Sequence, residues 1–173
     1  LDQPRAEITA RVLSALEHPR VHMMGHPSGR RIGSREPAAL DFERIFARAA
    51  ELNIAMEINS QPDRTDLSDV NARLAASLGV TISINTDAHA TDQLDFIRYG
   101  VFAARRAGLE KTQVLNTFPL ARFEAWLERR GQVSHHAAHA PAHPPAPLPA
   151  RKTGAPRRAP QPGTARPSPK PKP

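Results

Sequence analysis

The stretch VTISINTDAH, residues 80–89, decides the fold of this chain. Its first half alternates apolar and polar residues, which predicts a strand over 80–85 with one apolar face. Asp87 and His89 follow that strand directly, two residues apart. Side chains two apart on an extended segment point to the same side, so we expect a carboxylate and an imidazole to project together.

Two earlier apolar runs, at 21–25 and 54–58, predict two further strands, each followed by a polar loop. Amphipathic patterns predict helices around the strands, at 3–16, 37–52, 68–78, 96–106, 111–116 and 119–130. The last helix is expected to pack through Leu120, Phe123, Trp126 and Leu127. Alternating strands and helices are typical of an α/β fold, here with about three parallel strands. In such folds the loops at the carboxyl ends of the strands form the site.

These loops carry side chains that can bind a metal ion. His26 follows the first strand, as Asp87 and His89 follow the third. Two imidazoles and a carboxylate are common ligands of zinc, manganese and iron. Taken singly, an Asp-x-His pair or a lone histidine is more often structural, and His22 is expected to pack inside its strand. The position of all three residues at strand ends is what favours a metal site.

Charge and proline content divide the chain near residue 131. Residues 1–130 hold 17 basic and 17 acidic side chains, whereas 131–173 hold seven basic ones, no acidic ones and 12 of the 18 prolines. We therefore expect one folded domain over 1–130 and a disordered Pro/Ala/basic tail over 131–173. The basic side chains of the tail suit contacts with nucleic-acid phosphates, and a solubilising linker is the alternative.

The composition excludes several classes of protein. The chain has no Cys, which excludes a disulfide scaffold, a Cys-based zinc site and a thiol nucleophile. No apolar run approaches the roughly 18 residues that a membrane span needs, and no charged-then-apolar leader opens the chain. We expect a cytoplasmic protein without membrane contact.

Six short segments together resemble one known family. They are GHPSGR at 25–30, EIN at 57–59, PDR at 62–64, NTDAH at 85–89, DFIRYG at 95–100 and LNTFPL at 115–120. In order and spacing they resemble the late motifs of the PHP (polymerase and histidinol phosphatase) phosphoesterase superfamily. The closer resemblance is to the C-terminal PHP domain of bacterial family X DNA polymerases, and it covers nearly all of residues 1–130.

The resemblance implies a distorted (β/α)7 barrel with a trinuclear metal centre at the carboxyl ends of its strands. By motif, His26, Asp87 and His89 match metal ligands, with manganese expected and zinc or iron as alternatives. Glu57 and Asn59 match a segment that we assign to supporting the site. Three arginines in loops on the same rim are expected to hold phosphate: Arg30, Arg35 and Arg64.

The chain also departs from the family pattern. The early motifs, a His-x-His and the His and Glu ligands after it, are absent from residues 1–130, so we expect no trinuclear centre to assemble from this chain alone. A parallel α/β barrel needs about 250 residues. We therefore expect a fragment, the C-terminal portion of the barrel, with an open sheet edge. A chain supplying the missing half of the barrel, or a second copy, would cover that edge.

The resemblance implies a metal-dependent phosphoesterase, in its full-length form a 3′–5′ exonuclease on DNA attached to a DNA repair polymerase. We expect this chain to have weak or no activity by itself. Two alternatives stay open. One is a small-molecule phosphatase of the histidinol-phosphate type on the same fold. The other is a non-enzymatic element that tethers nucleic acid through its basic tail.

Overall fold

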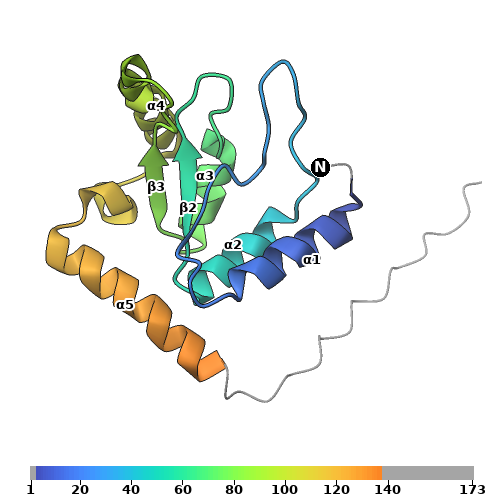
Figure 1. Cartoon of the computed structure of the whole chain (residues 1–173), viewed down its shortest axis with the longest axis vertical. Helices are drawn as coiled ribbons and strands as arrows, with labels where there is room; N and C mark the ends of the chain where they lie inside the picture. Colours follow the sequence, from blue (N-terminus) through green and yellow to red (C-terminus); the bar gives the residue numbers. More distant parts are fainter. Residues whose placement is uncertain (1–2, 138–173) are drawn as a thin grey trace, which may run out of the picture. The chain divides into compact units, whose positions relative to one another are not determined.

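Strands and helices alternate along the chain as the pattern of apolar residues predicts. The structure is a computed structural model that describes residues 3–137, with side chains up to residue 130. Figure 1 shows the elements, which are α1 (Arg5–Leu16), β1 (Met23–Met24), α2 (Phe42–Glu51), β2 (Ala55–Asn59), α3 (Asp69–Ser77), β3 (Ile82–Asn85), η1 (Thr91–Phe96), α4 (Ile97–Ala107), η2 (Lys111–Gln113), η3 (Leu115–Thr117) and α5 (Leu120–Ala137). Within this part no helix has the length and apolar composition needed to cross a membrane.

β1, β2 and β3 form a parallel sheet in that order, which confirms the predicted parallel arrangement. The register pairs Met24 with Met56 and Met56 with Ile82. The helix α2 connects β1 to β2, and α3 connects β2 to β3, so each connection is a βαβ unit. β1 contains two residues and is shorter than the strand predicted over 21–25.

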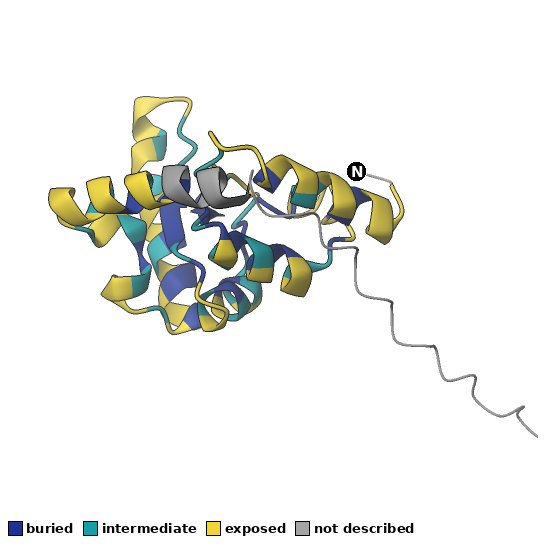
Figure 2. Ribbon diagram, turned by 90° about the horizontal axis from the view of Figure 1, so that it is seen from below, coloured by how far each residue is buried: buried dark blue, intermediate teal, exposed yellow. Residues whose placement is uncertain are grey.

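The two faces of the sheet differ in chemistry. Side chains alternate between the faces of a strand, so Met56 and Ile58 lie on one face of β2 while Glu57 and Asn59 lie on the other. The apolar face packs on α3 and α4, and α2 joins the same buried cluster. In Figure 2 these buried segments lie inside an exposed outer surface. The polar face of the sheet leads toward the loops that carry the predicted site.

Local hydrogen bonds decide where the helices begin. α3 begins after Ser68, as predicted. α2 begins after its capping residue Asp41 and not at residue 37. The reason is that the N–H of Ala38 donates to the carbonyl oxygen of Ser28 at 2.8 Å. This bond holds the residues before α2 against the preceding loop. The predicted helix at 111–116 is replaced by the short 3-10 turns η2 and η3.

The last helix is anchored by a buried tryptophan and a buried arginine. Trp126 is buried as predicted, whereas Leu120 is exposed, because it lies at the first residue of α5. The guanidinium of Arg130 donates to the carbonyl oxygens of Leu16 and His18 at 2.7 and 2.8 Å. α5 continues to residue 137, past the domain boundary expected at 130. The rest of the expected disordered tail, 138–173, lies outside the described residues.

Candidate functional site

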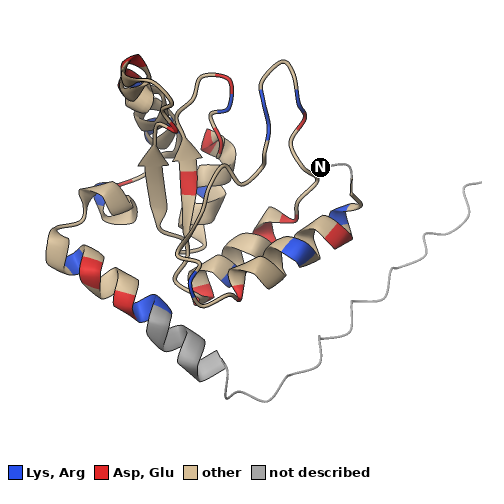
Figure 3. Ribbon diagram, in the orientation of Figure 1, with Lys and Arg blue, Asp and Glu red and all other residues tan. Residues whose placement is uncertain are grey.

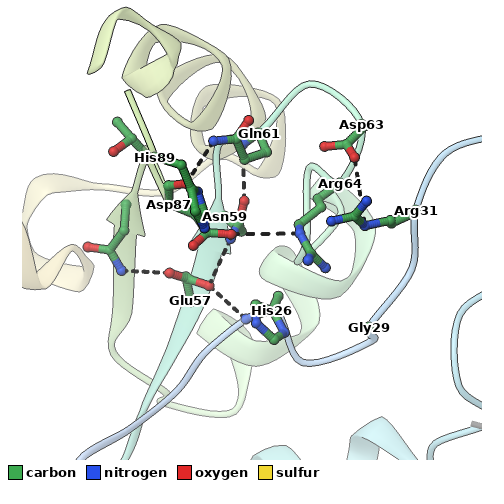
Figure 4. Close-up of polar contacts among 12 residues, drawn as sticks. His26, Gly29, Arg31, Glu57, Asn59, Gln61, Asp63, Arg64, Asp87 and His89 are labelled. Carbon is green, nitrogen blue, oxygen red and sulfur yellow. Dashed lines mark hydrogen bonds and ion pairs between the residues drawn. The ribbon is translucent and has the colours of Figure 1, made fainter. Parts of the chain in front are cut away.

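The loops that follow the three strands meet at the carboxyl end of the parallel sheet. There they form a hollow of about 410 Å³, called the polar hollow below. Figure 4 shows side chains from all three loops gathered in one place. The polar hollow is lined by His26, Arg31, Gln61, Asp63, Arg64, Asp87, His89 and Gln93.

Glu57 on β2 ties together the ends of the other two strands. Its Oε2 accepts a hydrogen bond from the backbone N–H of His26 at 2.7 Å, and its Oε1 accepts one from Asn85 Nδ2 at 3.0 Å (Figure 4). Glu57 is buried, where hydrogen bonds to a carboxylate are stronger than in water. These bonds hold the start of the first loop, where His26 has a left-handed φ of 32° that costs energy outside glycine.

Asn59 positions the carboxylate of Asp87 in the same way. Asn59 Nδ2 donates to Asp87 Oδ2 at 3.0 Å, and Arg64 Nε lies 3.7 Å from the same oxygen. Arg64 Nη1 is buried and has no hydrogen-bond partner among the described residues. A buried donor without an acceptor is costly, so this guanidinium is suited to a negatively charged ligand in the polar hollow.

The segment after β3 turns where the sequence predicts an extended chain. Asp87 has a left-handed φ of 53°. The prediction that Asp87 and His89 project together because they lie on an extended segment is therefore wrong. Hydrogen bonds fold the turn instead. Gln61 Nε2 donates to the carbonyl oxygen of Asp87 at 2.8 Å, and the N–H of His89 donates to Gln93 Oε1 at 2.9 Å. Asp87 and His89 thereby both line the polar hollow.

The predicted metal ligands share the polar hollow but do not form a complete donor set. His26, Asp87 and His89 all line it, and their donor types suit manganese, zinc or iron. Nowhere in residues 3–130, however, do three His, Asp or Glu side chains stand close enough to hold one metal ion. Metal binding by His26, Asp87 and His89 therefore stays a prediction, and it needs movement of these side chains or further donors.

The three arginines predicted to hold phosphate lie in different surroundings, and their phosphate binding stays a prediction. Arg64 lines the polar hollow. Arg30 instead donates from Nε to the carbonyl oxygen of Arg64 at 2.7 Å, and Arg35 donates from Nε to that of Gly29 at 2.6 Å. Arg31 was not predicted, yet it lines the polar hollow. Arg30 and Arg31 are adjacent in the sequence. No local feature of the sequence indicates that Arg31, and not Arg30, lines the polar hollow.

Comparison with known proteins finds relatives for most of the chain. The chain is 39% identical over 128 residues, 74% of its length, to the DNA polymerase/3'-5' exonuclease PolX of Bacillus subtilis (strain 168). The chain is a homologue of PolX. It is also 29% identical over 114 residues to a probable phosphatase of Syntrophotalea carbinolica, and 26% identical over 134 residues to one of Vibrio parahaemolyticus. No protein-family model matches the chain.

The homology to PolX and to the probable phosphatases confirms the resemblance to PHP-type phosphoesterases that the motifs indicate. The alignments cover only part of each relative. They span 22% of PolX, 45% of the Syntrophotalea carbinolica protein and 51% of the Vibrio parahaemolyticus protein. The chain therefore spans about a fifth of PolX and about half of each of the two phosphatases.

Proposed function

We propose that the polar hollow is part of a metal-dependent phosphoesterase site. His26, Asp87 and His89 are the proposed metal ligands, and Glu57 and Asn59 are the residues that hold two of them in place. The observation that carries this proposal is the meeting of three strand-end loops, which carry the segments that resemble PHP motifs, around one hollow. The hydrogen bonds from Glu57 to the loop of His26 and from Asn59 to Asp87 support it.

Manganese is the proposed ion, with zinc or iron as the alternatives. Bound divalent ions would lower the pKa of a bound water and neutralise negative charge on the phosphate. Among the side chains of this protein, Arg64 is proposed to bind the phosphate. Arg64 lines the polar hollow, and its Nη1 is a buried donor without a partner among the described residues. An anionic phosphate oxygen satisfies such a donor.

We further propose that the three-stranded sheet is the C-terminal portion of a distorted (β/α)7 PHP-type barrel. The two edges of the sheet support this proposal. Asn116 covers the edge at β3, since its side chain accepts from the N–H of Ile84 at 2.8 Å and donates to the carbonyl oxygen of Ile84 at 2.9 Å. At β1, the N–H of Ala55 donates to the carbonyl oxygen of His22. Alternate residues of a parallel strand bond to the same neighbour, so the backbone of Met23 faces away from β2.

An apolar hollow of about 610 Å³ adjoins the β1 edge and supports the same proposal. It lies between the polar-face side of the sheet and the segment from η3 to α5, and Met23, Phe123 and Trp126 are among its lining residues. Apolar surface of this kind is covered in a folded protein. The proposed cover is the remainder of a PHP-type barrel.

The proposed substrate is the 3′ end of DNA, hydrolysed in the 3′–5′ direction. Support comes from the greater identity to PolX, 39% against 26–29% for the two phosphatases above. Basic residues beyond 137, outside the described part, are proposed to add phosphate contacts to DNA. A small-molecule phosphatase is the second candidate, and the modest size of the polar hollow favours it. Hydrolysis of histidinol phosphate and of a 3′-recessed duplex, compared at equal protein and Mn²⁺, separates the two candidates.

Elemental analysis of the purified chain tests the proposed metal site. The chain is prepared with and without added Mn²⁺, as wild type, as the double variant Asp87→Ala/His89→Ala and as the control His18→Ala. All three proteins share the same tail, so metal held there cancels in the comparison. We expect metal in wild type and His18→Ala, and its loss in the double variant. Equal metal content in all three contradicts the proposed ligands, provided that circular dichroism shows the same fold.

A further inference from the structure

A short turn, residues 31–35 and called the arginine turn below, stands beside the polar hollow. Two backbone hydrogen bonds of 2.8 Å join its ends. The N–H of Arg31 donates to the carbonyl oxygen of Arg35, and the N–H of Arg35 donates to the carbonyl oxygen of Arg31. The N–H of Ile32 donates to the carbonyl oxygen of Asp63 in the neighbouring loop at 2.6 Å. Gly33 supplies the left-handed φ of 78° that the turn requires. The backbone of the arginine turn is therefore held both internally and from the side.

The arginine turn lies between two hollows. Arg31 lines the polar hollow. Arg35 lines a second hollow of about 620 Å³, whose walls come mainly from α1 and the loop after β1. His26 and Arg64 line both hollows, so the two adjoin at a proposed metal ligand. A substrate bound in the polar hollow thus lies next to Arg31 of the arginine turn.

The side chains of the arginine turn match the two chemical parts of a nucleotide. Arg31 is 48% exposed and only weakly paired, with its Nε 3.8 Å from Asp63 Oδ2. A guanidinium of this kind is suited to a phosphate. Ile32 is 57% exposed although it is apolar, and some nucleic-acid-binding proteins insert apolar side chains such as Ile between bases. Figure 3 shows basic residues on both limbs of the loop that carries the arginine turn. The acidic Glu36 follows Arg35 directly in the sequence.

We propose that the arginine turn holds a nucleic-acid strand at the polar hollow, with Arg31 on a backbone phosphate and Ile32 against a base. The inference rests on the proposed phosphoesterase function. It favours a nucleic-acid strand over a small phosphate ester as the substrate. Ile32 is not among the residues that line either hollow. A lone phosphate ester inside the polar hollow reaches Arg31 but not Ile32, so contact with Ile32 requires a substrate that extends beyond the hollow.

Site-specific crosslinking tests the contact directly. The photoreactive residue p-benzoylphenylalanine replaces Ile32 in the full chain. The variant is irradiated with a labelled single strand of about 12 nucleotides, a length within the binding-site size of single-strand-binding domains. The matched control places the same residue at Leu94 on η1, which is 58% exposed. We expect several-fold more crosslinked product from position 32. Equal yields from the two positions overturn the inference.

Binding titrations test the two side chains separately. Fluorescence anisotropy of the same strand is measured for Arg31→Gln and Ile32→Ser, with Arg98→Gln and Leu94→Ser as controls. Loss of one phosphate contact lowers the slope of log K against log salt by about 0.7. Loss of the apolar contact weakens binding about three- to tenfold and leaves that slope unchanged. Wild-type affinity and slope in both test variants overturn the inference.

Metal content of the wild-type chain and of Asp87→Ala/His89→Ala separates this inference from the proposed function. A preferred crosslink at position 32 with equal metal content in the two proteins means that the proposed metal site fails while the strand contact stands. Metal that is lost in the double variant without a preferred crosslink at position 32 means that the strand contact fails while the proposed metal site stands.

Discussion

Asn59 Nδ2 donates a hydrogen bond to Asp87 Oδ2 at 3.0 Å, so a side chain of β2 orients the carboxylate that follows β3. Asn59 is wholly buried, and its Oδ1 accepts from the N–H of Gln61 at 3.0 Å. The amide is therefore locked from both ends. It connects two strand-end loops across the sheet, and it determines which way the oxygen of Asp87 points.

The bond between these two residues predicts the effect of replacing Asn59 by Ala. Loss of a partner that orients a metal-binding carboxylate lowers metal affinity about 10- to 100-fold. Isothermal titration with Mn²⁺ measures the change, and Asn71→Ala on α3 is the matched control. Equal Mn²⁺ affinity for Asn59→Ala and wild type contradicts a supporting role for Asn59.

Replacing Gly100 by Ala is expected to destabilise the fold by about 1–3 kcal/mol. A Cβ at this position lies 2.1 Å from Ser60 Oγ and 2.5 Å from Ile84 Cγ2, closer than packed atoms approach. Urea unfolding measures the loss. The double variant Ser60→Ala/Gly100→Ala removes one of the clashing atoms, so part of the stability is expected to return. No difference between Gly100→Ala and the double variant argues against this clash.

The substitution Arg130→Leu is expected to lower the free energy of unfolding by about 2–4 kcal/mol. The side chain of Arg130 is buried, and its donors hold the carbonyl oxygens of Leu16, His18 and Val21 between 2.7 and 2.8 Å. Burial lowers the pKa of this guanidinium. The exposed neighbour Arg129→Leu serves as the control, with a change within about 0.5 kcal/mol. Similar unfolding curves for both variants contradict an anchoring role for Arg130.

An ion pair between Glu17 and Arg48 is expected to make stability depend on pH. Two hydrogen bonds from Arg48 at 2.7 and 2.8 Å lower the pKa of Glu17 below its ordinary value of 4.5, and partial burial opposes this shift. Because the folded pKa is the lower one, the contribution is present above pH 4.5 and disappears as pH falls through the folded pKa. Glu17 is 44% exposed, so Glu17→Gln is expected to cost less than about 1 kcal/mol at pH 7.

Urea titrations at pH 7 and at pH 3 check this dependence. The difference between wild type and Glu17→Gln is expected to shrink at the lower pH. Glu128→Gln, at an exposed position of α5, is the matched control and is expected to change little at either pH. A stability difference between wild type and Glu17→Gln that grows on acidification contradicts the predicted pH dependence.

Much of the fold was predictable because its signals are local. The alternation at 80–85 and the apolar run at 54–58 correspond to β3 and β2, and the polar residue Ser68 precedes α3 as predicted. The start of α2 was placed too early, at residue 37. The bond that delays it joins Ala38 to Ser28 across a loop, and no periodic pattern in the sequence reports such a bond.

The candidate site was predictable in its location and less so in its details. Parallel strands bring their carboxyl ends to one edge, so placing His26, Asp87 and His89 near one another followed from strand order. The turn at Asp87 and the position of Arg31 did not follow. Both depend on hydrogen bonds between loops, from Gln61 to Asp87 and from Ile32 to Asp63, whose partners lie about 26 and 31 residues apart in the chain.

The sequence by itself determined the order of strands and helices, the division of charge between the two parts of the chain and the kinship with PHP-type phosphoesterases. These depend on spacing and composition along the chain, which are local properties. The tertiary structure decided which side chains meet at the polar hollow, that Arg30 binds carbonyl oxygens while Arg31 lines the hollow, and that Met23 lies at an open edge. Those outcomes are set by contacts between segments far apart in the chain, which form only when the strands and loops pack together.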